Sequence, residues 1–168
     1  MTSLQMPKVQ KSILSKKDEI ITDLSKLLNS KNILSHEDEI RPYETDALAA
    51  YKQKPLLVVL PETVEQVSQI LKYCNQNKIK VVPRGAGTGL SGGALPLADC
   101  VLLGMGKFNK ILEIDYKNKC VVAQPCVTNL AITQAVQHDK FYYAPDPSSQ
   151  LACSIGGNVA ENSGVSTL

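Results

Sequence analysis

The chain has 168 residues, of which 43% are hydrophobic and 20% charged, and its net charge is +2. These values are typical of a soluble globular protein with a core of ordinary domain size. No apolar run approaches the roughly 18 residues of a membrane span, and no basic run carries interleaved aromatic residues. A transmembrane segment and a nucleic-acid partner are therefore not expected.

The N-terminal quarter of the chain is predicted to be helical and polar. Residues 1–15 form a basic lead-in without the apolar stretch of a secretory signal. Apolar residues at spacings of three and four then predict a helix over 16–29. Residues 31–54 are polar and predict a loop with a short helical turn. We divide the chain into a lead-in with its helix, residues 1–40, and a main domain, residues 41–168.

The next segments predict a strand, a helix and a second strand. The apolar run 55–61, PLLVVLP, is bounded by prolines and is typical of a buried strand. A helix is predicted over 63–77, where Thr63 and Gln66 form a capping-box pattern. Residues 78–83 predict a strand, and so short a connection favours a parallel crossover. The apolar side chains that define the inner face of the helix are Val64, Val67, Ile70, Leu71 and Cys74.

Three more strands and a helix are predicted in the second half of the chain. The apolar runs 100–105 and 119–125 predict strands. Residues 110–115 are expected to pair between these two strands, with a turn at 116–118. A helix is predicted over 128–138.

The cysteines and histidines show no metal-binding pattern. The five cysteines are an odd number without a CxxC pair, and His36 and His138 have no ligand-like spacing to them. We expect reduced, buried thiols in a cytosolic protein and no metal site. The cysteines are Cys74, Cys100, Cys120, Cys126 and Cys153.

Half of the ten glycines fall within the segment PRGAGTGLSGG, residues 83–93. Glycine permits positive φ and lets a ligand approach the backbone, so successive amides can form a nest for an anion. Thr88 and Ser91 add hydroxyl groups, and Arg84 adds one positive charge. The segment therefore favours a phosphate-binding loop.

Three phosphate motifs and one alternative without a ligand are compatible with glycine-rich loops. A P-loop is excluded because no Lys-Ser or Lys-Thr follows a glycine. Gly87, Gly89 and Gly92 match GxGxxG, but a strand rather than a helix is predicted after them, which disfavours a dinucleotide fold of the Rossmann type. A loop that cradles a pyrophosphate between two strands remains, and so does a flexible hairpin that binds nothing. A second glycine-bearing segment at 153–164 favours a ligand held by two loops.

Two motifs together resemble a known family. PRGAGTGLSGGALP (83–96) resembles the pyrophosphate loop of FAD-linked oxidases of the vanillyl-alcohol-oxidase type, which have a PCMH-type FAD-binding domain. YAPDPSSQLACSIGGNVAENSG (143–164) is similar to their second flavin loop, and residues 41–67 are similar to the same group. The match is closest to glycolate oxidase FAD subunits and related D-2-hydroxy-acid dehydrogenases. The resemblance implies an α+β domain of two subdomains with FAD between them, and oxidation of a 2-hydroxy acid.

The resemblance also implies a set of FAD-binding residues. Those expected at the pyrophosphate are Arg84, Gly85, Ala86, Gly87, Thr88, Gly89 and Ser91. Those expected along the flavin or ribityl side are Pro145, Asp146 and Ser149. Those expected to line the second loop through their backbone are Cys153, Gly156, Gly157, Asn158 and Gly164.

The resemblance also bears on whether FAD is bound covalently and on which residue acts as the catalytic base. Some relatives bind FAD covalently through a histidine, but Thr88 stands at that position, so non-covalent FAD is expected. Asp146 and Glu161 are the carboxylates near the motifs, and both are interpreted as structural. We therefore assign no catalytic residue.

Family members continue past the second motif, whereas this chain has Val165 in place of a further glycine and ends at Leu168. We therefore expect a fragment with little activity alone, without the substrate domain. Half of a split enzyme completed by another chain, and a non-catalytic nucleotide-binding module, remain as alternatives. The expected location is cytoplasmic, with peripheral contact to the inner membrane through partner subunits.

Overall fold

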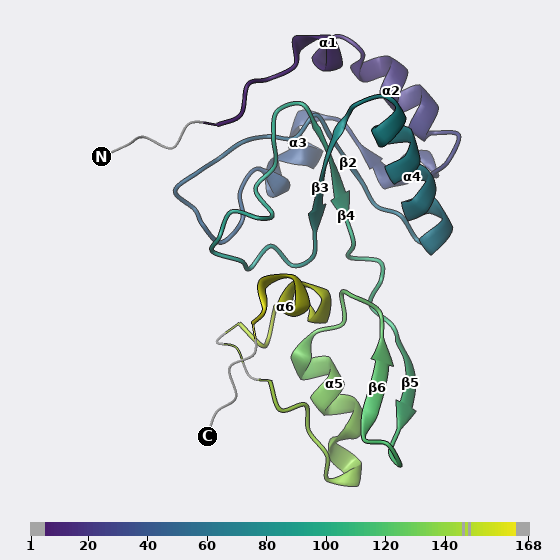
Figure 1. The fold of residues 1–168 in the computed structure, drawn as a ribbon, viewed down its shortest axis with the longest axis vertical. Coiled ribbons are helices and arrows are strands. Elements are labelled where there is room, and N and C mark those ends of the chain that lie inside the picture. Colours follow the sequence, from purple (N-terminus) through teal and green to yellow (C-terminus); the bar gives the residue numbers. More distant parts are fainter. Residues whose placement is uncertain (1–5, 146, 148, 164–168) are drawn as a thin grey trace.

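The computed structural model describes residues 6–145, 147 and 149–163, which form two units (Figure 1). The mixture of helices, a parallel sheet and an antiparallel hairpin confirms the predicted α+β class. The elements of the first unit are α1 (Lys11–Leu14), α2 (Lys17–Leu24), β1 (Ile33–Leu34), α3 (Glu37–Ile40), β2 (Leu57–Val59), α4 (Val64–Gln76), β3 (Lys80–Arg84) and β4 (Cys100–Gly104). The second unit contains β5 (Ile111–Asp115), β6 (Cys120–Ala123), α5 (Asn129–Val136) and α6 (Ile155–Glu161). Single 3-10 turns lie at Ser30–Asn32, Arg41–Tyr43 and Gln137–Asp139.

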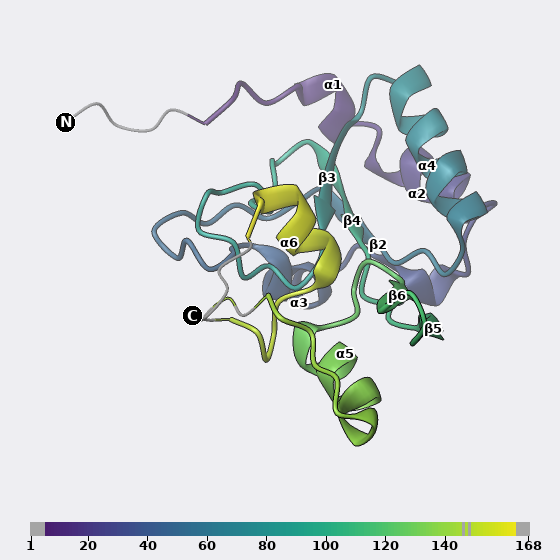
Figure 2. The ribbon, with the colours of Figure 1, turned by 60° about the horizontal axis from the view of Figure 1, so that its bottom comes forward.

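The second unit is built on a hairpin rather than on a continuation of the first sheet. β5 pairs with β6 alone, and the turn predicted at 116–118 connects them. The prediction that 110–115 would pair between two strands is correct for β6 and wrong for β4, because β4 already pairs with β2 on one edge and β3 on the other. In both Figure 1 and Figure 2, α6 lies between the β3–β4 part of the sheet and α5.

The first sheet has the strand order β1-β2-β4-β3. β2 and β3 are both parallel to β4, and β1 is antiparallel to β2. The strand, helix and strand predicted over 55–83 therefore form as expected, with β4 inserted between the two strands. β1 is two residues long, and no sequence pattern predicted it.

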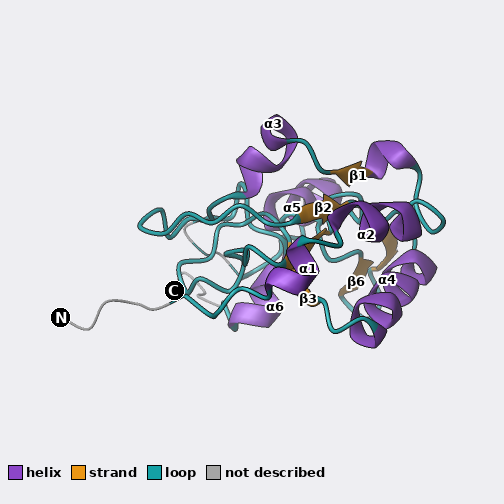
Figure 3. Cartoon of the chain, turned by 90° about the horizontal axis from the view of Figure 1, so that it is seen from above, coloured by secondary structure: helices purple, strands orange, loops and turns teal. Residues whose placement is uncertain are grey.

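The sheet is covered by helices on both faces, which explains the continuous apolar runs of its central strands. Leu57 and Val59 pack in one cluster with residues of α1, α2 and α4, whereas Val58 and Leu102 pack with Ile40 of α3. Figure 3 shows α3 on one side of the strands and α2 and α4 on the other. The N-terminal helices thus share a core with the sheet.

α4 begins where its sequence predicts. The Thr63 hydroxyl accepts a hydrogen bond from the Gln66 amide at 3.2 Å, while the Gln66 side chain accepts from the Glu62 amide at 2.7 Å. The second half of the capping box is therefore shifted by one residue. The predicted inner face is only partly correct, because Val64 and Leu71 are 73% and 44% exposed.

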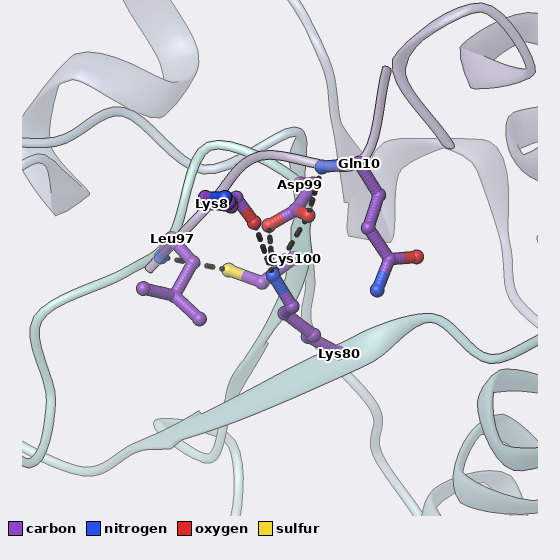
Figure 4. Close-up of polar contacts among 6 residues, drawn as sticks. All are labelled: Lys8, Gln10, Lys80, Leu97, Asp99 and Cys100. Atoms are coloured by element: carbon purple, nitrogen blue, oxygen red, sulfur yellow. Dashed lines mark hydrogen bonds and ion pairs between the residues drawn. The ribbon is translucent and has the colours of Figure 1, made fainter. Parts of the chain in front are cut away.

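A partly buried ion pair fixes the first described residues to the sheet (Figure 4). The Lys80 Nζ atom lies 2.8 Å from Asp99 Oδ2, and the Gln10 amide donates to the same oxygen at 2.7 Å. Lys80 also donates to the Lys8 carbonyl at 3.3 Å. Burial by itself would raise the pKa of Asp99, but these hydrogen bonds outweigh it and hold the pKa below its ordinary value. The N-terminal segment is thereby attached to β3 and to the start of β4.

Candidate functional site

The glycine-rich segment between β3 and β4 contains no helix or strand, as predicted. Gly87 has a φ of +73°, a conformation that a residue with a side chain rarely adopts. Its carbonyl accepts a hydrogen bond from the Ala47 amide at 2.9 Å, and the Arg84 carbonyl accepts from the Met105 amide at 2.9 Å. The loop is therefore fixed to two other segments of the chain.

Arg84 holds this loop against the segment that follows α3. Its Nη1 atom donates to the carbonyl of Thr45 at 2.7 Å and to that of Tyr43 at 3.4 Å. The guanidinium also lies 5.7 Å from the centre of the Tyr43 ring. Burial lowers the pKa of Arg84, and the negative charge of Asp46 opposes that effect. The charge of Arg84 is thus partly buried beside the loop.

The second glycine-bearing segment is a helix, and the prediction of a loop is wrong there. Ser154 caps α6 by accepting a hydrogen bond from the Gly157 amide at 3.3 Å. The Gly156 amide donates to the Pro125 carbonyl at 2.8 Å. A Cβ atom built on Gly156 would lie 2.7 Å from Pro125 Cβ, so glycine permits this close approach. A short antiparallel bridge between Thr128 and Ser154 completes the contact.

The loop and α6 face each other across a cleft of about 420 Å³. The structure brings most of the predicted FAD-binding residues to this cleft. Those that line it are Arg84, Gly85, Ala86, Gly87, Thr88, Gly89, Ser149, Cys153, Gly156, Gly157 and Asn158. Ser91 and Pro145 do not line it. Asp146 and Gly164 lie outside the described residues.

Further residues that the sequence did not single out line the same cleft. Met105 follows β4, and Pro125 and Cys126 follow β6, so all three lie just beyond strand ends. Met105 and Pro125 end the two predicted strands and Cys126 follows the second, and this position was the available signal, because strand ends commonly form ligand sites. The other additional lining residues are Pro83, Gly93, Ala94, Ser154, Ala160, Glu161 and Ser163.

The two walls of the cleft also touch each other directly. The Ser91 hydroxyl donates to Glu161 Oε2 at 2.7 Å. A Cβ atom built on Gly85 would lie 2.5 Å from Ser154 Oγ. Among the described residues that line the cleft, Arg84 and Glu161 carry charge. The cleft therefore offers backbone, hydroxyl groups and one guanidinium, with a carboxylate that is held by a serine.

The histidines do not contribute to the cleft. His36 caps α3, and the imidazole of His138 lies 2.9 Å from the Asp139 carboxylate at the surface. Across the described ranges, no three side chains of His, Cys, Asp or Glu are grouped to hold a metal ion. No helix within those ranges is long and apolar enough to cross a membrane.

Two of the cysteines line the cleft, and none of the five forms a disulfide. Cys126 is half-buried and Cys153 is buried. Burial raises the pKa of Cys126, so its thiol is protonated at neutral pH. The expectation of buried thiols fails at Cys120, which is exposed on β6.

Comparison with known proteins agrees with this geometry. Residues 55–167 match the model of the FAD binding domain. The chain is 60% identical over 132 residues to the glycolate oxidase subunit GlcD of Escherichia coli, covering 79% of this chain and 26% of that protein. It is 37% identical over 135 residues to a D-lactate dehydrogenase of Anaerostipes hadrus, covering 80% of this chain and 28% of that protein. The chain thus spans about a quarter of the length of these relatives.

Solved structures share the fold. A 4-ethylphenol oxidase from Gulosibacter chungangensis superposes with a TM-score of 0.75 at 25% identity, covering 92% of this chain and 30% of that one. p-Cresol methylhydroxylase gives a TM-score of 0.75 at 24% identity, covering 94% of this chain and 31% of that one. The resemblance drawn from the two sequence motifs is confirmed.

Proposed function

The chain belongs to the FAD binding domain family, and on this premise we propose that it forms the FAD-binding part of a flavoprotein that oxidises 2-hydroxy acids to 2-oxo acids. The substrates proposed are of the glycolate or D-lactate class, as the names of the relatives suggest. One observation carries the assignment of the site. Two glycine-bearing segments about 70 positions apart in the sequence line a single cleft of about 420 Å³.

The residues of the cleft fit a dinucleotide with a pyrophosphate. Glycines from Gly85 to Gly89 leave space for phosphate oxygens to reach the backbone, and Thr88 adds a hydroxyl group. A Cβ atom built on Gly87 would lie 2.5 Å from Arg84 Nη2, so a side chain there would displace the Arg84 guanidinium. Residues 84–89 and Ser91 would hold the pyrophosphate. Ser91 would first have to release Glu161, to which it now donates.

The opposite side of the cleft would hold the rest of the cofactor. We assign Pro145, Asp146 and Ser149 to the flavin or ribityl side. Cys153, Gly156, Gly157 and Asn158 form the second wall. Gly164, which lies outside the described residues, is proposed as a further FAD-binding residue by motif position alone. The amides of Gly156 and Gly157 already donate to Pro125 and Ser154, so these two glycines contribute space rather than free donors.

FAD, when bound, supplies the acceptor for the hydride that leaves the substrate carbon. The described residues of this chain bind and orient the cofactor and exclude water from it. No histidine of the described residues lines the cleft, and we assign none of the lining residues as the base for the hydroxyl proton of the substrate. We also propose that this chain assembles with other subunits of a glycolate oxidase, and that any association with a membrane occurs through those subunits.

FAD binding by the purified chain tests the assignment. Titration with FAD, followed by flavin fluorescence, is expected to show saturable binding of one FAD per chain. Acid precipitation is expected to release all flavin into the supernatant, because Thr88 stands where a covalent relative would have a nucleophile. An absence of saturable binding would contradict the proposed function, and flavin retained in the washed pellet would contradict the non-covalent bond.

A further inference from the structure

A buried chain of two amide side chains connects the cleft to the segment after α5. Asn158 Nδ2 donates to Asn129 Oδ1 at 2.6 Å, and Asn129 Nδ2 donates to the Pro145 carbonyl at 2.9 Å. Asn129 is 2% exposed and Asn158 is 7% exposed. Asn158 lies on α6 and lines the cleft, whereas Asn129 begins α5 behind it. These contacts link two helices that are adjacent in Figure 1.

The Pro145 carbonyl determines which way both amides point. A backbone carbonyl accepts hydrogen bonds and cannot donate them, so Asn129 must turn its NH₂ group toward Pro145. The oxygen of Asn129 then faces Asn158, so Asn158 must donate to it from its own NH₂ group. Because an amide carries its oxygen opposite its nitrogen, the remaining group of Asn158 is an acceptor. A flip of either amide would place two donors or two acceptors against each other in a buried environment.

Asn158 belongs to the lining of the cleft. Its Nδ2 atom is used by Asn129, and no described residue donates to its Oδ1 atom. The side chain can therefore offer a ligand in the cleft an acceptor but no free donor toward Asn129.

We propose that Asn158 presents Oδ1 to the cleft as an acceptor for an O–H or N–H group of bound FAD, and that Asn129 is the positioning residue that fixes this orientation. The inference rests on the proposed function, because FAD supplies the donor. An acceptor repels phosphate oxygens, so Asn158 contacts a part of FAD other than the pyrophosphate. It thereby gives the second wall a selectivity that the glycines beside it cannot provide.

Two parts of FAD carry suitable donors, and two simpler ligands separate them. The ribityl hydroxyls and the flavin N3–H are present in FMN, whereas the ribose hydroxyls and amino group of adenosine are present in ADP. Both compounds are tested as competitors of FAD. Weaker FMN competition in an Asn158 variant places the donor in the flavin half, and weaker ADP competition places it in the adenosine half. Either result supports the acceptor role.

The main experiment compares Asn158→Leu with the unsubstituted chain. Leucine has a similar size but no acceptor, and FAD affinity is expected to fall roughly fivefold to tenfold. Asn129→Leu lets the Asn158 amide adopt both orientations, so affinity is expected to fall by about twofold. The double variant is expected to bind no more weakly than Asn158→Leu alone. A merely structural role for Asn129 predicts additive losses instead.

Asn158→Asp is a second test variant, which keeps the proposal testable if the leucine variants fail to fold. Aspartate keeps the shape, and in its protonated form it can donate to Asn129 and still present an oxygen to the cleft. Its FAD affinity is therefore expected to approach that of the unsubstituted chain at low pH. Affinity should fall as the pH rises through the pKa of the new carboxyl group, because the carboxylate cannot donate to Asn129 and repels the anionic ligand.

The outcomes separate this inference from the proposed function. If the unsubstituted chain binds FAD but Asn158→Leu binds FAD, FMN and ADP within twofold of it, the acceptor role is wrong and the FAD assignment stands. If additive losses appear in the double variant, the positioning role of Asn129 is wrong. If the unsubstituted chain binds no FAD, the proposed function is wrong and this inference with it.

Discussion

The two glycine-bearing segments of the cleft use glycine for different physical reasons. In the loop after β3, Gly87 has a φ of +73°, so the backbone conformation itself requires glycine. In α6, Gly156 is helical, and glycine is required there because Pro125 lies where a Cβ atom would be. The first segment uses conformational freedom to shape a cradle, and the second uses small size to bring a helix close. Similar sequence composition thus produces two different structures.

This difference predicts different responses to substitution. A side chain at Gly87 strains the backbone and displaces the Arg84 guanidinium beside the cleft, so it should mainly reduce ligand binding. A side chain at the start of α6 separates the helix from the end of β6, so it should mainly reduce stability.

Gly87→Val is expected to weaken FAD binding by about a hundredfold or more, because a β-branched residue at positive φ is strained and its Cβ would lie 2.5 Å from Arg84 Nη2. The measurement is a fluorescence titration with FAD. Gly106→Ala is the matched control, because a Cβ atom there meets nothing within 4 Å. Equal affinity of Gly87→Val and the unsubstituted chain would remove the loop from the binding site.

Gly156→Ala is expected to lower the free energy of unfolding by about 2 kcal/mol, because the new methyl group displaces α6 from Pro125. Gly157→Ala is the matched control in the same helix. Its Cβ would lie 3.1 Å from the Ser154 hydroxyl, and alanine favours a helix by about 1 kcal/mol over glycine. Urea unfolding of both variants decides the matter. Equal losses would mean that the contact with Pro125 is not the reason for glycine at 156.

Asp99→Asn separates stability from binding, because Asp99 lies in the ion pair with Lys80 and outside the cleft. At pH 7 the variant is expected to lose about 1 to 2 kcal/mol of stability with an unchanged Kd for FAD. The pKa of Asp99 is below its ordinary value, so its carboxylate stabilises the fold above about pH 4. That contribution disappears as the pH falls through the lowered pKa.

Thermal unfolding of Asp99→Asn between pH 3 and pH 7 measures this dependence. The difference from the unsubstituted chain should narrow as the pH falls below about 4. A constant difference across this range would show that the charge of Asp99 is not what stabilises the N-terminal segment.

The smallest expected effect is protection of a cysteine by the ligand. Cys126 is half-buried and lines the cleft, whereas Cys120 is exposed on β6 away from it. Saturating FAD should slow alkylation of Cys126 severalfold and leave Cys120 unchanged. Burial raises the pKa of both Cys74 and Cys100 to about 11, so these two should react only after unfolding. Equal rates at Cys126 with and without FAD would place the ligand elsewhere.

Much of the first unit was predictable because its strands and caps are local signals. β2 and β4 are buried on both faces, and their runs of apolar residues show it directly. Thr63 identified the start of α4. The separate β5–β6 sheet was not predictable, because it depends on β4 having both edges occupied. The exposure of Val64 and Leu71 likewise depends on how α4 sits on the sheet.

In the candidate site, the loop was predictable because its signal is also local, whereas α6 was not. The loop from Gly85 to Gly89 is continuous in sequence, so its composition revealed it. α6 was missed because its two glycines and lack of apolar periodicity disfavour a helix. It forms through the Ser154 cap and the hydrogen bond from Gly156 to Pro125, and the second of these is a tertiary contact.

Amide hydrogen exchange, measured with and without FAD, tests the assignment of the cleft on both of its walls at once. FAD is expected to slow exchange in residues 85–93 and in residues 155–161, while exchange on the surface of α4 is unchanged. Saturable FAD binding without protection in either segment would contradict the assignment of the cleft. Protection of the loop alone would contradict the claim that two segments hold the cofactor together.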